Sequence, residues 1–492
     1  MIQDLKPYPA YKDSGVPWLG GVPEHWGVRR SRNAVEMRVS NIDKHTKDGE
    51  QPVRLCNYVD VYKNDRITDR LSFMRATARP DEIKRFRMEP GDVLITKDSE
   101  SWNDIGVPSL VEYAAPDLVC GYHLALLRPF RGLLEGAYLL RALQSPAIAY
   151  PFYVAANGVT RYGLSHDAIK SFLLPLPPLP EQAAIARFLD HADRRIRGYI
   201  RAKKKLIKLL GEQKQAIIHR AVTRGLPSTG SGQATPDVRL KPSGVGWLGE
   251  VPEHWDVAAL RHRYSQCLGK MLDSKRITGS HALPYLRNTD VQWDRINVDD
   301  LPAMDIPPAE YGRYTVQRGD LLVCEGGEVG RCALWSGELA VCGFQKALHR
   351  LRPRNVGQDV PRFMYYVLRA AAKGNAFNDG HLSTIAHLTG DKLRAHRFPF
   401  PPMAEQHLLV SFLDAALKQI DQAAFTALRE IALLREYRTR LIADVVTGKL
   451  DVREAAARLP EEEEPLVDGV DGVDEDTMDG EEGDDESDSD SA

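Results

Sequence analysis

Two aspartates and a lysine near the middle of the chain have the types and order of a metal-dependent nuclease centre. Pro236-Asp237 precedes Asp273-Ser-Lys275, and paired carboxylates beside a lysine can hold a metal ion at a phosphate. Asp237, however, directly follows PSTGSGQATP (227–236), whose composition is that of a flexible linker. Because carboxylates on such a segment are hard to preorganise, we interpret the match as chance. A nuclease around Asp273 stays a third hypothesis.

Other catalytic patterns are absent from the sequence. There is no GxxxxGK[ST], HExxH or GxSxG, and GGEVG at 326–330 does not fit GxGxxG. The Asn/Asp-Pro-Pro-aromatic tetrapeptide typical of adenine methyltransferases is missing too, since PLPPLP (175–180) shares only its prolines. We therefore expect a non-catalytic chain that binds no metal and no cofactor of its own.

Composition indicates a cytoplasmic chain. Six cysteines occur without a CxxC pair, so neither a zinc site nor a disulfide framework is expected. No run of 18 apolar residues is present, and the first residues lack the pattern of an export signal.

The charge of the chain is divided unevenly along its length. The formal net charge is −3, but Glu461 to Ala492 contain 17 acidic residues and no Lys or Arg. Residues 1–460 therefore carry 65 basic and 51 acidic side chains, a net of +14. A basic body favours a polyanionic partner such as nucleic acid, although solubility alone would also explain it. The acidic segment has few large apolar residues and should be disordered.

Two pairs of nearly identical passages divide the chain into halves. Ser14–Trp26 (SGVPWLGGVPEHW) and Ser243–Trp255 (SGVGWLGEVPEHW) lie 229 positions apart. Pro175–Asp190 (PLPPLPEQAAIARFLD) and Pro399–Asp414 (PFPPMAEQHLLVSFLD) lie 224 positions apart. The interiors between them, about 145 residues each, match only in scattered places. The repeated unit is thus a whole domain followed by a helix.

The elements that must position any site are similar in both halves. An irregular arm (1–27) precedes a mixed region with strands at Asp92–Thr96 and His123–Arg128 and a helix at Leu133–Leu143. The second half has a matching strand at Asp320–Cys324, and its CGFQ (342–345) matches CGYH (120–123) of the first half.

A long helix closes each half, at Glu181–Arg224 and 405–446. Their apolar residues follow heptad-like steps of three and four, which favours a coiled coil. The first seam is Ile185, Leu189, Ala192, Ile196, Tyr199, Leu206, Leu210 and Ile217. The second is Leu409, Leu413, Ala416, Ile420, Ala423, Ala427, Leu434 and Leu441. We predict an α+β protein: two mixed α/β domains joined by two long antiparallel coiled-coil helices, with an internal pseudo-two-fold repeat. Alternatively, each helix packs only on its own domain.

The duplicated motifs SGVPWLGGVPEHW and PLPPLPEQAAIARFLD, in this order, resemble those of the specificity subunit of type I restriction-modification systems. The resemblance covers about residues 8–452. It implies target-recognition domains in about 28–174 and 256–398 that each read one part of a split DNA sequence, with the helices as spacer. The implied domain boundaries are 1–180, 181–225 (helix), 226–242 (linker), 243–404, 405–450 (helix) and 451–492 (disordered acidic tail).

The resemblance also implies partners. They are double-stranded DNA, two methylation subunits that dock on the chain, and restriction subunits. S-adenosylmethionine, ATP and Mg would be used by those other subunits. A role in phage defence follows from the same resemblance.

Polar loop residues of the two recognition domains are the candidates for DNA binding. Arg161 is suited to a guanine, Gln345 to an adenine and Thr160 to phosphate. The full set is Lys97, Ser99, Ser101, Asn103, Thr160, Arg161, Tyr162, Arg331, Gln345, Lys346, Asn378 and His381. Each is equally consistent with a solvated loop or a capping residue.

The repeated frame residues are expected to be structural. Trp18, Trp26, Trp247 and Trp255 recur in both halves, whereas a sequence reader should differ between them, so we interpret them as packing anchors. Glu181-Gln182 and Glu405-Gln406 open the helices, where negative charge suits the helix dipole.

Two alternatives remain open. One is a non-catalytic scaffold whose repeated domains bind two protein partners. The other concerns the acidic tail, which either shields a basic groove or only keeps the chain soluble.

Overall fold

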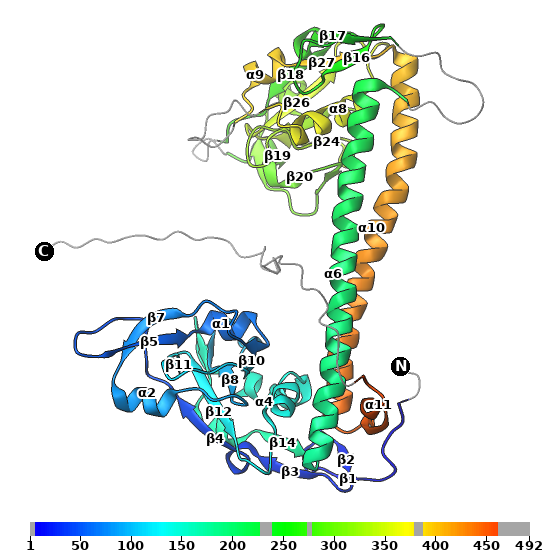
Figure 1. Cartoon of the computed structure of the whole chain (residues 1–492). Helices are drawn as coiled ribbons and strands as arrows, with labels where there is room; N and C mark the ends of the chain where they lie inside the picture. The colour runs from blue at the N-terminus through cyan, green and yellow to red at the C-terminus, as the bar shows by residue number, and fades with distance from the viewer. Residues whose placement is uncertain (1–4, 227–238, 273–277, 378–386, 461–492) are drawn as a thin grey trace, which may run out of the picture. The chain divides into compact units, whose positions relative to one another are not determined.

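The computed structural model describes residues 5–226, 239–272, 278–377 and 387–460 (Figure 1). Asp237, Asp273, Lys275, Asn378, His381, most of the expected linker and the tail from 461 onward lie outside these ranges. The chain divides into two compact units. Unit 1 is Met1–Ala202 with Glu430–Ala492, and unit 2 is Lys203–Arg429.

The globular part of unit 1 is built on a five-stranded sheet. Its order is β4 (Val35–Val39), β12 (Leu124–Pro129), β8 (Val93–Thr96), β10 (Pro108–Val111) and β6 (Arg66–Ile67). All pairs are antiparallel except the parallel β10–β6. Alternate side chains of β8 enter different cores: Val93 and Ile95 pack on one face, and Leu94 packs on the other. The predicted strands at Asp92–Thr96 and His123–Arg128 are thereby confirmed.

Smaller elements complete unit 1. A second sheet has the order β11 (Leu118–Cys120), β5 (Gln51–Cys56), β7 (Met74–Ala78). There are also three separate strand pairs: β1 (Tyr11–Asp13) with β2 (Gly21–Pro23), β3 (Gly27–Arg30) with β14 (Leu173–Leu176), and β9 (Asp98–Ser99) with β13 (Tyr162–Gly163). The short helices are α1 (Tyr58–Lys63), α2 (Pro80–Phe86), α3 (Gly136–Leu143), α4 (Pro146–Ala155) and α5 (His166–Ser171). The expected irregular arm thus contains a hairpin, and α3 confirms the helix predicted at Leu133–Leu143.

Unit 2 repeats this topology with different sequence. Its main sheet has the order β18 (Tyr264–Leu268), β26 (Leu348–Pro353), β23 (Leu321–Cys324), β24 (Cys332–Leu334), and its second sheet β22 (Ala303–Asp305), β19 (Ala282–Leu286), β25 (Gly343–Phe344). The pairs are β15 (Leu240–Pro242) with β16 (Glu250–Pro252), β17 (Asp256–Ala259) with β27 (Arg397–Phe400), and β20 (Val291–Gln292) with β21 (Arg295–Ile296). The helices are α7 (Tyr311–Tyr314), α8 (Pro361–Lys373) and α9 (Gly390–Ala395). The predicted strand at Asp320–Cys324 is confirmed by β23.

The two long helices are α6 (Leu179–Arg224) and α10 (Met403–Val446). In unit 1 the beginning of α6, at Ile185 and Leu189, shares a core with the end of α10, at Val445. In unit 2 the end of α6, at Val222, shares a core with the beginning of α10, at Leu413. The predicted antiparallel pairing is therefore confirmed, and neither helix packs only on its own domain.

The spacing of the buried residues confirms the predicted heptad in α10 and corrects its phase in part of α6. Tyr199 and Leu206, both expected in the seam, are 52% and 40% exposed, and Ala423 is exposed too. In α10 the positions Leu413, Ile420, Ala427, Leu434 and Leu441 are all buried or half-buried, so the heptad runs through the helix. In α6 two successive steps of four, from Ala192 to Ile196 and on to Ile200, interrupt it. Such a stutter locally unwinds a coiled coil, and it turns Leu206 outward and Ile207 inward.

Two expected boundaries are wrong. Residues 451–460, assigned to the disordered tail, contain α11 (Arg453–Ala457), and Val452 and Ala456 are buried in the core of unit 1. The expected linker 226–242 ends before Leu240, because β15 pairs with β16 from that residue onward. Residues 451–460 fold on partners that are distant in the sequence, whereas β15 forms a local hairpin with β16; composition reveals neither.

Candidate nucleic-acid interface

In unit 1 the fold brings the two candidate polar loops together. Strand β9 pairs with β13, so that Ser99 lies opposite Tyr162 and Asp98 lies opposite Gly163. The Leu164 amide also donates to the Lys97 carbonyl at 2.8 Å. Residues 97–103 and 157–163 therefore form one surface at the end of β8, although more than 50 positions separate them in the chain.

A carboxylate organises the centre of this surface. Asp98 Oδ2 accepts from Lys97 Nζ at 3.0 Å and lies 2.8 Å from His123 Nδ1. Lys97 Nζ is also 4.8 Å from the centroid of the Tyr122 ring, a cation–π distance. Lys97 is thus held within the domain surface, with Tyr122 and His123 fixed beside it.

The other predicted residues of unit 1 differ in exposure. Asn103, Thr160 and Arg161 are exposed, Ser101 and Tyr162 are half-buried, and Ser99 is buried. Ser101 Oγ donates to Asn103 Oδ1 at 2.6 Å, while Ser99 Oγ accepts from the Ser101 amide at 3.2 Å. Arg161 and Thr160 are therefore presented to solvent, and Ser99 stabilises the loop.

Aromatic side chains that sequence reasoning did not single out surround this loop. Trp102 and Tyr122 are about half exposed, and the Tyr58 and Tyr62 rings stack at 5.4 Å. Tyr62 donates to Asp104 Oδ2 at 2.5 Å, and this bond raises the pKa of Tyr62 to about 12. Burial raises the pKa of Tyr58 despite its hydrogen bond to Ser99. The sequence could have pointed to Tyr122 and His123, because CGYH (120–123) in the first half resembles CGFQ (342–345) in the second.

Unit 2 has different side chains at the equivalent positions. The Leu388 amide donates to the Glu325 carbonyl at 2.8 Å, so Glu325 stands where unit 1 has Lys97. After β25, Gln345 is half-buried and Lys346 is exposed, and their amides donate to the carbonyls of Leu286 and Lys270 at 3.0 Å. Gln345 and Lys346 thus follow β25 as Gly121 and Tyr122 follow β11, and Ala347 takes the position of His123.

Arg331 does not point outward with them. It is half-buried, and its Nη2 donates to the Asn288 carbonyl at 3.0 Å. Its placement supports a role in holding the Asn288 loop. Asn378 and His381, predicted for the same surface, lie outside the described residues.

The duplicated frame forms the same clamp in each unit. Trp26 Nε1 donates to Glu181 Oε1 at 3.0 Å, and His25 Nε2 lies 2.9 Å from Oε2. In unit 2, Trp255 and His254 contact Glu405 at 3.0 and 2.8 Å.

Packing supports the structural interpretation of this frame. Trp26 and Trp255 are completely buried, which confirms them as packing anchors, whereas Trp18 is 49% exposed and Trp247 is half-buried. Gln182 and Gln406 bind backbone groups of their own domains. The first helical turn therefore fastens each arm and domain to its helix.

Two further properties bear on chemistry. Among the described residues, no three His, Cys, Asp or Glu side chains are grouped as a metal ion would require. In the same part of the chain, no helix is long and apolar enough to span a membrane.

Comparison with known proteins agrees with two repeated recognition domains mounted on long helices. The model of the type I restriction modification DNA specificity domain matches residues 76–209 and 269–431. This match covers more than half of the chain, and the chain belongs to that family.

Individual relatives are similar over almost their whole length. The chain is 24% identical to the putative type I restriction enzyme MjaX specificity subunit of Methanocaldococcus jannaschii, over 88% of this chain and 96% of the relative. It is 21% identical to the type I restriction enzyme EcoKI specificity subunit of Escherichia coli K12, over 87% and 94%.

Two solved structures share the fold. One, from a study of complex assembly and conformational transition of the type I R-M system, has a TM-score of 0.66 at 18% identity, over 87% of this chain and 99% of that chain. The HsdS subunit from Thermoanaerobacter tengcongensis has a TM-score of 0.50 at 19% identity, over 87% and 98%.

Proposed function

We propose that the chain is the DNA-recognition subunit of a type I restriction-modification complex and reads a bipartite target, one half-site with each unit. The observation that carries this proposal is that the two units share a fold but have different side chains at equivalent positions of one surface. Lys97, Tyr122 and His123 in unit 1 correspond to Glu325, Lys346 and Ala347 in unit 2. A common frame with different polar ends suits two readers of different sequences.

Charge and geometry support DNA as the ligand. Residues 1–460 carry a net charge of +14, and neutralised phosphates contribute a large, salt-dependent share of DNA affinity. Two readers on one chain also make the second contact intramolecular, which raises the overall affinity. In this proposal Arg161 contacts a base, Thr160 and Lys346 contact phosphate or a base edge, and Lys97 and Ser99 position the loop.

The chemistry belongs to other subunits in this proposal. The chain binds two methylation subunits and the restriction subunits, which use S-adenosylmethionine, ATP and Mg, and it works in the cytoplasm. The exposed Trp18 lies in the shared frame, where a partner common to both halves would dock.

Methylation mapping of the genome by single-molecule sequencing, with and without this chain, tests the proposal. A split methylated motif that disappears with the chain is expected. Exchanging Tyr122→Lys and His123→Ala, the residue types of unit 2, should then alter one half of the motif and leave the other half and the gap unchanged. If methylation is unaffected but partner proteins are lost from the assembly, a protein scaffold is the correct function.

A further inference from the structure

The first part of α6 carries an exposed row of cations that the recognition surface does not use. From Arg194 to Lys208 the helix contains eight Lys or Arg side chains and no Asp or Glu. Arg187, His191, Arg194 and Arg201 follow steps of four, three and seven, which place them on one helical face. The three arginines are exposed, and Lys205 and Lys208 continue the same spacing. We call Arg187, Arg194 and Arg201 the cationic stripe.

The described chain ends beside the first residue of this stripe. Arg187 Nη2 donates to the carbonyls of Leu459 and Pro460, both at 2.9 Å. Val452 and Ala456 anchor the preceding turn in the core of unit 1. Whatever follows Pro460 therefore starts next to the stripe.

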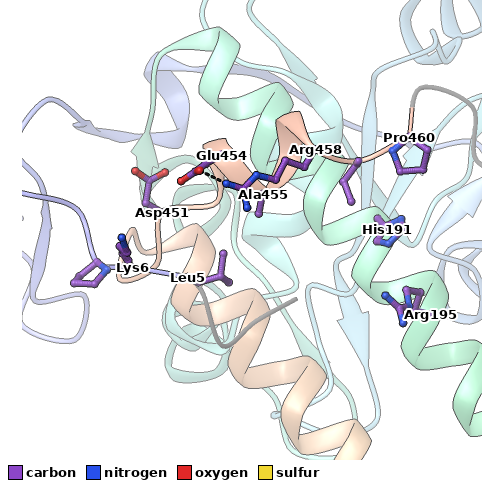
Figure 2. Close-up of a pocket in the computed structure, with 11 residues that line it drawn as sticks. Leu5, Lys6, His191, Arg195, Asp451, Glu454, Ala455, Arg458 and Pro460 are labelled. Carbon is purple, nitrogen blue, oxygen red and sulfur yellow. Dashed lines mark hydrogen bonds and ion pairs between the residues drawn. The ribbon is translucent and has the colours of Figure 1, made fainter.

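A cavity at this point is lined by both segments (Figure 2). It has a volume of about 880 Å³, and His191 and Arg195 of α6 face it together with Arg458 and Pro460 from the C-terminal segment. Lys6 of the arm lies at its other side. Four lining side chains are basic or can be protonated, namely Lys6, His191, Arg195 and Arg458, and two are acidic, namely Asp451 and Glu454.

The 32 residues after Pro460 have the complementary charge. They begin with four consecutive glutamates, Glu461 to Glu464, and contain 17 acidic and no basic side chains. A chain of this length can extend about 100 Å, whereas the helix rises about 20 Å from Arg187 to Arg201. Because the segment is tethered at Pro460, its local concentration at the stripe is in the millimolar range.

We propose that residues 461–492 bind along the cationic stripe of α6 and over the Lys6–Arg458 cavity, as an intramolecular polyanion that covers this face. The occupant is the chain's own acidic segment, because this segment follows Pro460 directly in the sequence. Its glutamates neutralise a face that would otherwise attract phosphates unselectively.

Zero-length carbodiimide cross-linking of the full chain without DNA tests this docking directly. Carboxylates of residues 461–492 should cross-link to Lys6 and to lysines 204, 205 and 208 of α6. Lys84 and Lys170, exposed elsewhere on unit 1, should remain free of them. At about 1 M salt, where the screening length falls to about 3 Å, the cross-links should disappear. Cross-links spread evenly over all lysines, or none at low salt, would overturn the proposal.

Lysine acetylation rates provide a second measurement on matched variants. Changing Glu461, Glu462, Glu463 and Glu464 to Gln should speed acetylation of Lys6 and Lys204 several-fold and leave Lys84 and Lys170 unchanged. Charge reversal of the stripe (Arg194→Glu, Arg201→Glu) should abolish the cross-links, whereas Arg131→Glu with Lys170→Glu should not. Unchanged acetylation and surviving cross-links would refute docking. Neither readout involves DNA, so this failure is distinct from failure of the proposed function.

Discussion

Single residues fix how each arm is attached to its long helix. Glu181 is buried and accepts from Trp26, His25 and Tyr8. Removing the carboxylate would leave the buried Trp26 and Tyr8 donors without partners, at a cost of about 1–3 kcal/mol each. We predict that Glu181→Ala lowers the unfolding free energy by several kcal/mol in denaturant titration. Glu24→Ala, an exposed neighbour, should stay within about 0.5 kcal/mol, and equal values for both variants would refute the clamp.

Arg161 is the residue whose loss should affect base recognition most clearly. It is exposed on the surface formed by β9 and β13, and a bidentate contact to a base contributes about 1–3 kcal/mol of discrimination. Arg161→Ala should therefore weaken binding of the specific duplex about 5- to 150-fold in competition titrations. The control is Arg131→Ala, exposed beyond the opposite end of β12. A similar small loss for both would show that Arg161 contributes only charge.

His349 gives unit 2 a predicted pH dependence. It is buried on β26, with Nε2 2.7 Å from the Leu388 carbonyl and Nδ1 2.8 Å from Gln266 Nε2. Burial lowers the pKa of His349 below 6.5, so the unfolded chain binds the proton more readily than the folded chain. Its stability contribution is complete above pH 6.5 and is lost as the pH falls below it. The melting temperature of wild type should drop more between pH 7.5 and 5.5 than that of His349→Gln, and parallel curves would contradict this.

At the scale of elements, the buried face of each long helix decides which of its leucines stabilise the protein. Leu413 is completely buried in unit 2, whereas Leu408, five positions earlier on α10, is 59% exposed. Leu413→Ala should lower the unfolding free energy by about 2–5 kcal/mol because it leaves a cavity. Leu408→Ala changes the same chemical group on the surface and should cost less than about 0.5 kcal/mol. Thermal and denaturant unfolding of both variants measures this difference, and equal losses would refute the assigned register.

At the scale of the whole molecule, the chain is a duplication, and each half attaches its domain to its long helix in the same way. Strands β3 and β14 pair over four positions in unit 1, and β17 and β27 pair over four positions in unit 2. The first turn of each long helix presents the same acceptor to its domain, Glu181 in α6 and Glu405 in α10. Further along the helices, Asp190 of α6 binds Arg141 and Asp414 of α10 binds Arg362.

This equivalence predicts that one domain can replace the other. A chain in which residues 260–396 replace residues 31–172 should fold on the same frame. It should direct methylation to a symmetric split motif that repeats the half-site of unit 2. Methylation mapping with the methylation subunit present gives the result, and an unchanged asymmetric motif would contradict reading by separate domains.

Sequence alone determined the features that are local or periodic. The repeated motifs, the two long helices, several strands and the basic body with its acidic end are written in neighbouring residues, and propensity and charge act at that range. It also predicted that polar segments 97–103 and 157–162 would lie on the recognition surface, although not that they lie side by side.

Tertiary structure decided what depends on distant contacts. The pairing of β9 with β13, the Asp98–His123 contact and the bond from Trp26 to Glu181 join residues 25 to 155 positions apart. Folding of 451–460 depends on a core shared with the N-terminal arm. The phase shift of the seam in α6 after Ile196 was also decided there, because it is visible only in which residues are buried along the helix.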